Sequence, residues 1–165
     1  MHENQTLKKK ILTNFFMEHS HVVEDVVWSN SNAVNYITKG IANTGGDVKP
    51  YETSSENNNL ASRFVVSCAR DKSIKLWDVV TNTLVFDLTG HDNWVREIKF
   101  HPGGRWLISA SDDRSIKTWD LENVRAHKTL NDAHEHFVAC LDIHKKGNKV
   151  VSGSVDTKIN VWDCR

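Results

Sequence analysis

The stretch GHDNWVREIKFHP, residues 90–102, decides the fold, because it recurs as AHEHFVACLDIHK at residues 133–145. The two copies are 43 residues apart, and the match continues where SASDDRSIKTWD (109–120) lies over SGSVDTKINVWD (152–163) at the same shift. A further copy of this second motif, SCARDKSIKLWD (67–78), falls 42 residues before 109–120. The chain is therefore built from a unit of forty-odd residues repeated in tandem.

Tandem units of about 40 to 45 residues that end in Trp-Asp are typical of β-propeller blades, each a four-stranded antiparallel sheet. In this the chain resembles the WD-repeat family. We predict an all-β fold, a WD-repeat β-propeller fragment of about three four-stranded antiparallel blades. Alternating apolar residues support strands in every unit. The predicted strands lie around Val26 to Trp28, Ile98 to Phe100 and Leu141 to Ile143 (first strands), at 64–66, 106–108 and 149–151 (second), before Trp77, Trp119 and Trp162 (third), and near 84–88 and 128–130 (fourth).

The repeats divide the chain into predicted segments. These are 1–17, holding at 11–17 the fourth strand of a preceding blade; 18–90, a repeat with a polar insertion at about 29–62; 91–133, a second repeat; and 134–165, a C-terminal repeat that lacks its fourth strand. Because known propellers close with at least four blades, three would leave two blade faces and open sheet edges exposed. We therefore expect the chain to be a fragment or a partial gene product.

The insertion explains one irregular spacing. The equivalent His and Asp residues are 22 residues apart in the second and third units, whereas His19 and Asp71 are 52 residues apart. The surplus falls in residues 29–62, which are rich in Asn, Ser and Gly. This composition predicts a mobile, irregular loop.

Four residue types recur at fixed spacing in each unit. They are His19, Ser67, Asp71 and Trp77; His91, Ser109, Asp113 and Trp119; and His134, Ser152, Asp156 and Trp162. Serine, histidine and aspartate could form an acyl-transfer triad. The resemblance to WD-repeat proteins implies instead a buried hydrogen-bonded relay, and leaving one member of such a relay unpaired costs about 1–3 kcal/mol. Since an enzyme needs one such constellation and this chain has three, we predict a structural role and no enzyme activity.

Metal and cofactor sites are weakly supported. The residue types that bind zinc cluster in the last unit, at His134, His136, Cys140 and His144. However, strand alternation places the side chains of Cys140 and His144 on the side of the sheet that the first strand sets. His134 is already a member of the tetrad, so it is not available as a ligand. Neither of the two Gly-Gly pairs precedes the Lys-Ser/Thr that cradles phosphate. We expect no metal and no cofactor.

Composition limits the partners. The chain carries 21 basic and 21 acidic residues, so no overall field favours nucleic acid or an anionic membrane. No window approaches the ~20 apolar residues that span a bilayer, and the N-terminus is a poor signal peptide. The three cysteines, Cys68, Cys140 and Cys164, lack pairing or ligand spacing and suit reduced thiols in the cytosol. We expect a soluble cytoplasmic protein without disulfides that binds proteins, not nucleic acid, and does not insert into membranes.

A closer resemblance rests on GHDNWVR (90–96), AHEHFV (133–138) and GSVDTKINVWDCR (153–165), which are similar to the end of the lissencephaly family of WD-repeat proteins. It covers about residues 18–165 and includes the position of the insertion. It implies a regulator of cytoplasmic dynein, at microtubules and centrosomes, in microtubule-based transport, nuclear migration and spindle positioning. The implied partners are the dynein heavy chain, its adaptors, and the catalytic subunits of platelet-activating-factor acetylhydrolase, of which the family is a non-catalytic subunit.

The same resemblance implies partner-binding residues at Arg70, Trp94 and Arg114, on turns at one face of the blades. Arg70 and Trp94 keep family residues that contact the dynein motor ring, whereas Arg114 stands where the family has lysine, which keeps the charge but changes the donor geometry. Tryptophan and arginine are enriched at interaction hot spots. Alternatively, Trp94 packs beneath its turn, as Phe137 and Val22 occupy the matching places, and both arginines are solvated turn residues.

A second interpretation remains open, in which the chain is another WD-repeat adaptor, such as a substrate receptor of a ubiquitin ligase or a signalling scaffold. For either function, three blades offer only part of a ring face, while stable complexes bury about 1,200–2,000 Å². We expect binding by this chain alone to be weak.

Overall fold

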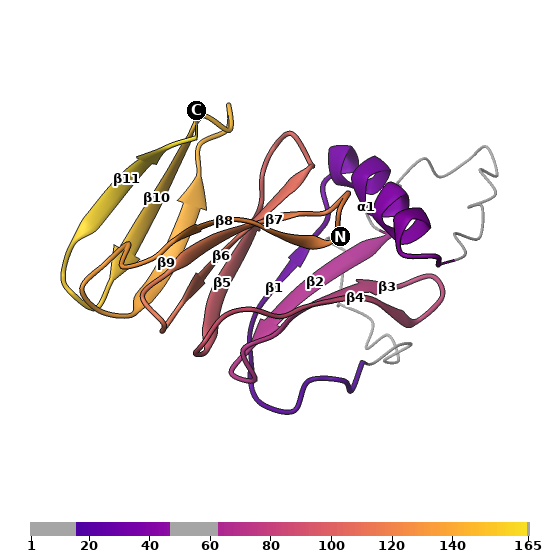
Figure 1. The fold of residues 1–165 in the computed structure, drawn as a ribbon, viewed down its shortest axis with the longest axis horizontal. Coiled ribbons are helices and arrows are strands. Elements are labelled where there is room, and N and C mark those ends of the chain that lie inside the picture. Colours follow the sequence, from indigo (N-terminus) through magenta and orange to yellow (C-terminus); the bar gives the residue numbers. More distant parts are fainter. Residues whose placement is uncertain (1–15, 47–62, 165) are drawn as a thin grey trace, which may run out of the picture.

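Strands dominate the computed structural model, which describes residues 16–46 and 63–164 (Figure 1). In chain order the elements are β1 (Val23–Trp28), α1 (Ser31–Asn43), β2 (Phe64–Ala69), β3 (Ile74–Asp78), β4 (Thr83–Leu88), β5 (Val95–Phe100), β6 (Trp106–Ser111), β7 (Ile116–Asp120), β8 (Arg125–Leu130), β9 (Val138–Ile143), β10 (Lys149–Ser154) and β11 (Ile159–Asp163). They form four-stranded antiparallel sheets β1–β4 and β5–β8 and a three-stranded sheet β9–β11, with neighbours in chain order. The predicted fold class is confirmed.

The second hairpin of each sheet turns in the same way. In the β2–β3 turn, the Asp71 carboxylate accepts a hydrogen bond from the backbone N–H of Ser73 at 3.0 Å. The residue after each turn aspartate, Lys72, Arg114 or Thr157, has a φ of 68° to 72°, which is unfavourable for non-glycine residues. The aspartate side chain therefore stabilises a turn that the backbone alone would disfavour.

The sheets pack face to face through their apolar side chains, with β1 beside β5 and β5 beside β9 (Figure 1). Between the first two sheets, Phe64, Leu76, Ile98 and Leu107 have no exposed surface and Trp119 is 1% exposed. A smaller core lies between the second and third sheets and is centred on residues such as Ile108, Val138 and Val150. The repeat thus buries its apolar residues mainly between neighbouring blades.

The prediction of an irregular loop over 29–62 is wrong for its first half, which forms helix α1. Its N-terminus is capped by Asn30, whose side chain accepts a hydrogen bond from the backbone N–H of Ala33 at 2.9 Å. Ala33, Val34 and Ile37 form one apolar face and are buried in the core between the first two sheets. The polar composition hid this short apolar stripe, and residues 47–62 lie outside the described part of the chain.

Helix α1 ties the first blade to the second. Near its start, the Asn30 side chain donates to the backbone oxygen of His101 at 3.0 Å. At its end, the Asn43 side chain donates to the backbone oxygen of Glu122 at 2.9 Å. Both acceptors lie in turns of the second sheet, so the helix spans the junction at the end of the sheets that carries the β5–β6 and β7–β8 turns.

The two outer faces are open among the described residues. Trp28 on β1 is 59% exposed, and Ile159 on β11 is 79% exposed. Most of the strand predicted at 11–17 falls outside the described residues, and its last two residues, Phe16 and Met17, lie in no strand. Phe16 instead packs its ring 4.7 Å from that of Trp77.

Replacing Gly40 with alanine is expected to destabilise the protein by about 1–3 kcal/mol, although alanine favours helices by about 1 kcal/mol. A Cβ at this position would overlap the backbone oxygen of Leu121, so α1 would have to shift away from the second sheet. Urea unfolding followed by circular dichroism measures the change. Asn35→Ala, on the exposed face of the same helix, is the control and should not lower stability, because alanine is the better helix former. A gain in stability for Gly40→Ala would contradict the packing described.

Candidate functional site

The four recurring residues meet inside each blade. In the second blade the Trp119 indole N–H donates to the Ser109 hydroxyl oxygen at 2.8 Å. His91 Nε2 lies 2.7 Å from the same oxygen, and His91 Nδ1 lies 2.7 Å from the Asp113 carboxylate. The chain of contacts runs from the third strand through the second strand to the loop before the first strand, and ends in the turn between strands two and three.

The directions of these hydrogen bonds follow from the charge of the aspartate. Burial opposes ionisation of Asp113, but hydrogen bonds from His91 and Ser115 outweigh it and hold the pKa of the carboxyl well below its usual range. An ionised carboxylate only accepts, so His91 donates from Nδ1, and in the neutral form of the ring Nε2 then accepts from the Ser109 hydroxyl. Every polar atom of the relay then has a partner, as buried polar groups require.

The first and third blades repeat the geometry. His19 contacts Ser67 at 2.7 Å and Asp71 at 2.8 Å, and the Trp77 indole donates to Ser67 at 2.8 Å. In the third blade the corresponding distances are 2.8, 2.9 and 2.9 Å, for the contacts among His134, Ser152, Asp156 and Trp162. Three copies within 0.1–0.2 Å of one another belong to the architecture of the repeat.

The connectivity of serine, histidine and aspartate matches that of an acyl-transfer triad, so burial is the deciding observation. Ser109 has no exposed surface, and its oxygen already accepts from an indole N–H. A nucleophile must reach a substrate carbonyl beside oxyanion donors. The arrangement in this blade is suited to holding the hairpin and not to attacking a substrate.

The zinc candidates do not meet. His134 is engaged by Ser152 and Asp156, and within residues 16–46 and 63–164 no group of three or more His, Cys, Asp or Glu side chains is placed to hold a metal ion. The three cysteines are free thiols. The described residues also include no helix long and apolar enough to cross a membrane.

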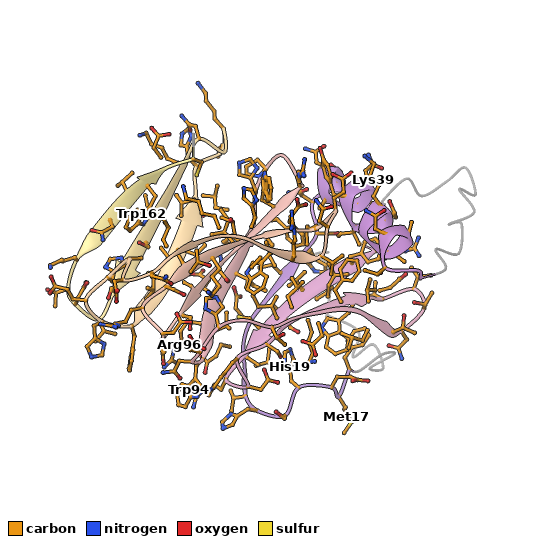
Figure 2. The ribbon with its side chains drawn as sticks, in the orientation of Figure 1. Met17, His19, Lys39, Trp94, Arg96 and Trp162 are labelled. Atoms are coloured by element: carbon orange, nitrogen blue, oxygen red, sulfur yellow. The ribbon has the colours of Figure 1, made fainter. Side chains whose placement is uncertain are left out.

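Trp94 lies at the opposite end of the sheets from α1, and two guanidinium groups lie close to its ring. The Arg70 guanidinium carbon stands 4.4 Å from the centre of the Trp94 ring, and that of Arg96 stands 4.9 Å from it. Trp94 is half-buried, so it neither packs fully in the core nor projects freely into solvent. Figure 2 shows Trp94 and Arg96 together at the lower edge of the view and Lys39 of α1 at the upper edge. We call Arg70, Trp94 and Arg96 the Trp94 cluster.

Carboxylates hold the two arginines in place. Arg96 binds Asp112 through two nitrogens, at 2.8 and 2.7 Å, and lies 3.5 Å from Glu24. Arg70 forms an ion pair with the same Glu24. The hydrogen bond from Arg70 lowers the pKa of the Glu24 carboxyl. Glu24 belongs to the first blade and Asp112 to the second, so the cluster bridges two blades.

Arg114 lies apart from this arrangement. Its side chain is 52% exposed and forms an ion pair with Asp132 at 3.0 Å, in the segment that leads to the third blade. The structure thus brings two of the three predicted partner-binding residues together, Arg70 and Trp94, and directs the third toward a neighbouring loop. Exposed ion pairs of this kind contribute about 0–1 kcal/mol, so a partner could displace Asp132 at little cost.

Sequence reasoning missed Arg96 as a member of the cluster. A signal for it exists, because residues 94 and 96 of an extended segment lie on the same side. What the sequence did not provide is Glu24, which comes from another blade and helps to orient both arginines. That pairing depends on how the sheets are placed next to each other.

The comparisons with known proteins agree with the repeat. The family model for the WD domain, G-beta repeat, matches residues 54–78, 82–120 and 126–163. Three similar proteins are each named Lissencephaly-1 homolog. That of Branchiostoma floridae is 40% identical over 88 residues (53% of this chain and 19% of that protein), that of Dictyostelium discoideum 37% over 119 residues (72% and 28%), and that of Heterostelium pallidum 40% over 117 residues (71% and 28%). The chain spans little more than a quarter of these relatives at most. Both resemblances stated from the sequence are confirmed.

Replacing Ser109 with alanine is expected to lower the free energy of unfolding by about 1–3 kcal/mol, because the indole N–H of Trp119 and Nε2 of His91 lose their shared buried partner. Urea unfolding followed by tryptophan fluorescence measures the loss. Ser20→Ala, at an exposed position in the loop before β1, serves as the control and should lie within about 0.5 kcal/mol of the parent. Equal stability of the Ser109 and Ser20 variants would refute the relay as a stabilising element.

The tetrad aspartates predict acid sensitivity. Burial alone would raise the pKa of Asp71, but hydrogen bonds from Ser73 and His19 lower it to about 2. Because this folded-state value is below the unfolded value of about 3.9, the stabilisation is complete above about pH 5 and is lost as the pH falls toward 2. Asp71→Asn should therefore be less stable than the parent at pH 7, with the difference shrinking toward pH 2. Urea unfolding across this range tests it, and a difference that stays constant with pH would count against it.

Proposed function

The chain belongs to the WD-domain, G-beta repeat family, and on this premise we propose that it is a non-catalytic protein-binding scaffold of the lissencephaly type. It acts in the cytoplasm at microtubules and binds cytoplasmic dynein through the Trp94 cluster. The observation that carries the proposal is the half-buried Trp94 with the guanidinium groups of both Arg70 and Arg96 close to its ring. The resemblance also implies dynein adaptors and acetylhydrolase catalytic subunits as partners.

The geometry of the cluster suits protein recognition. Stacking on the indole and pairing with carboxylates restrain side chains that would otherwise lose about 0.5–1.5 kcal/mol each of conformational entropy on binding. The arginines still keep surface for a partner, because their side chains are 32% and 25% exposed. A flat aromatic ring in contact with restrained arginine side chains is the kind of anchor found at interaction hot spots.

Replacing Trp94 or Arg70 with alanine is expected to weaken binding of a dynein motor domain by about 30-fold or more, which corresponds to a hot-spot loss of about 2 kcal/mol. Arg96→Ala should behave like Arg70→Ala, since both guanidinium groups cover the same ring. Arg114→Ala should lose less, because that arginine stands apart against Asp132. Surface-immobilised chain titrated with the motor domain gives the affinities.

Lys39→Ala on α1 is the control, since this exposed residue lies at the far end of the sheets, and it should leave the affinity unchanged (Figure 2). Circular dichroism checks that each variant keeps its fold. Unchanged affinity in the Trp94 and Arg70 variants would exclude this surface. No binding of dynein by the parent, with capture of ubiquitin-ligase subunits instead, would favour the alternative adaptor.

A further inference from the structure

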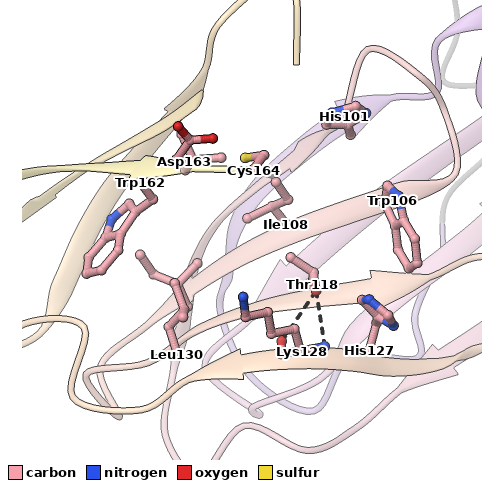
Figure 3. Close-up of a pocket in the computed structure, with 12 residues that line it drawn as sticks. His101, Trp106, Ile108, Thr118, His127, Lys128, Leu130, Trp162, Asp163 and Cys164 are labelled. Atoms are coloured by element: carbon pink, nitrogen blue, oxygen red, sulfur yellow. Dashed lines mark hydrogen bonds between the residues drawn. The ribbon is translucent and has the colours of Figure 1, made fainter. Parts of the chain in front are cut away.

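A cavity of about 590 Å³ opens between the second and third sheets, away from the Trp94 cluster (Figure 3). Figure 3 shows Trp106 and His127 on one side of it and Trp162 on the other. Ile108, Leu130 and Val150 contribute apolar walls. The volume falls within the range of about 300–1,000 Å³ that ligand sites occupy.

The equivalent place between the first and second sheets is filled. Counting back one repeat, Thr118 and Lys128 of the cavity wall correspond to Leu76 and Phe86, and Cys164 corresponds to Leu121. Leu76, Phe86 and Leu121 are at most 4% exposed, and they share one core with the apolar face of α1. The close approach of Gly40 to both Phe86 and Leu121 places the helix directly on this wall. The cavity between the second and third sheets therefore corresponds to the site that α1 occupies between the first and second sheets.

The two junctions also differ in the connection between the first and second strands of the blade. The first blade carries α1 in the connection between its first and second strands, whereas the second blade makes this connection with a short turn after His101. A Cβ on Gly104 would meet the backbone of Asn32 and Ala33, at the start of the helix. A Cβ on the equivalent Gly147 would meet the ring of His101. The His101 ring therefore fills only the space that corresponds to the first turn of α1. The space that corresponds to the rest of α1 is the cavity.

The cavity also differs in charge from the site that α1 occupies. Lys128 replaces Phe86 in the wall, and Lys149 is half-exposed, with its ammonium 3.9 Å from Asp163. Lys145 and Lys146 are exposed in the turn between β9 and β10. A segment that docks here would meet an apolar floor and an edge at which Lys128 and Lys149 outnumber Asp163.

We propose that this cavity is a docking site for an amphipathic α-helix of a protein partner, with small or β-branched residues on its apolar face and acidic residues on its flank. The first junction already shows such an arrangement. There the equivalent wall buries Ala33, Val34 and Ile37 of the capped helix α1. The site is independent of the Trp94 cluster, since the two share no residue. It adds a second, simultaneous contact to the proposed scaffold.

The probe is a synthetic peptide with the sequence of residues 30–46, in its natural form and with Lys39→Glu. Both should bind the full chain with one-to-one stoichiometry, and the Lys39→Glu peptide about threefold or more tighter because of Lys128 and Lys149. An isolated helix of this length is marginally stable, so dissociation constants in the high micromolar range are expected. Isothermal titration or the anisotropy of a labelled peptide measures them.

Two variants of the chain locate the site. Thr118→Trp fills the cavity and should weaken both peptides about tenfold or more. Lys128→Glu should reverse the preference for the acidic peptide. Lys72→Glu, an equal charge change at an exposed turn of the first blade, is the control and should leave both affinities unchanged.

Three results would overturn the proposal. They are the absence of saturable binding of either peptide to the parent chain, an unchanged preference in Lys128→Glu, and evidence from sedimentation that a second copy of the chain occupies the cavity in place of the peptide. The Lys128 result stands even if Thr118→Trp does not fold, because Lys128 is exposed. Dynein binding should survive the Lys128 change, so failure here is distinguishable from failure of the Trp94 cluster.

Discussion

The serine hydroxyl that joins a tryptophan to a histidine within each blade is the contact on which the rest of the structure depends. Buried polar groups are tolerated only when they are paired, and here one oxygen pairs with two neighbours. Through the histidine, the contact extends to an ionised aspartate that also stabilises a strained turn. One relay therefore joins the second and third strands, the turn between them and the loop before the blade. The residues of the Trp94 cluster lie in or beside such turns and loops, so the relays also restrain the cluster.

Packing between blades is the second constraint, and the two junctions satisfy it differently. At the first junction α1 completes a core whose residues are at most 4% exposed. At the second, the corresponding wall carries Thr118 and Lys128 and borders a cavity. The same sheet geometry thus yields one closed junction and one open junction, because the second junction has no helix in the corresponding connection and has Thr118 and Lys128 where the first has Leu76 and Phe86. The cavity proposed as a helix-docking site lies where the repeat departs from its own pattern.

Much of the fold was predictable because periodicity survives in a single sequence. The Trp-Asp endings located the third strands, and the recurring His, Ser, Asp and Trp residues met as a relay at 2.7–2.9 Å. The helix was not predicted, since its apolar face is short and lies within a segment of polar composition. The partner of Arg70 and Arg96 was also missed. Glu24 lies 46 residues from one and 72 from the other, and no local pattern links them.

By itself, the sequence determined the all-β class, the number of units, and the residues that form each relay, because these depend on spacings within one repeat. The tertiary structure alone decided which side chains from different blades meet. It places the guanidinium groups of Arg96 and Arg70 close to the Trp94 ring and pairs Arg114 with Asp132. It also leaves a cavity at the junction between the second and third sheets. The reason is physical: contacts between blades depend on the relative placement of whole sheets, and the spacing of residues within a repeat carries no record of that placement.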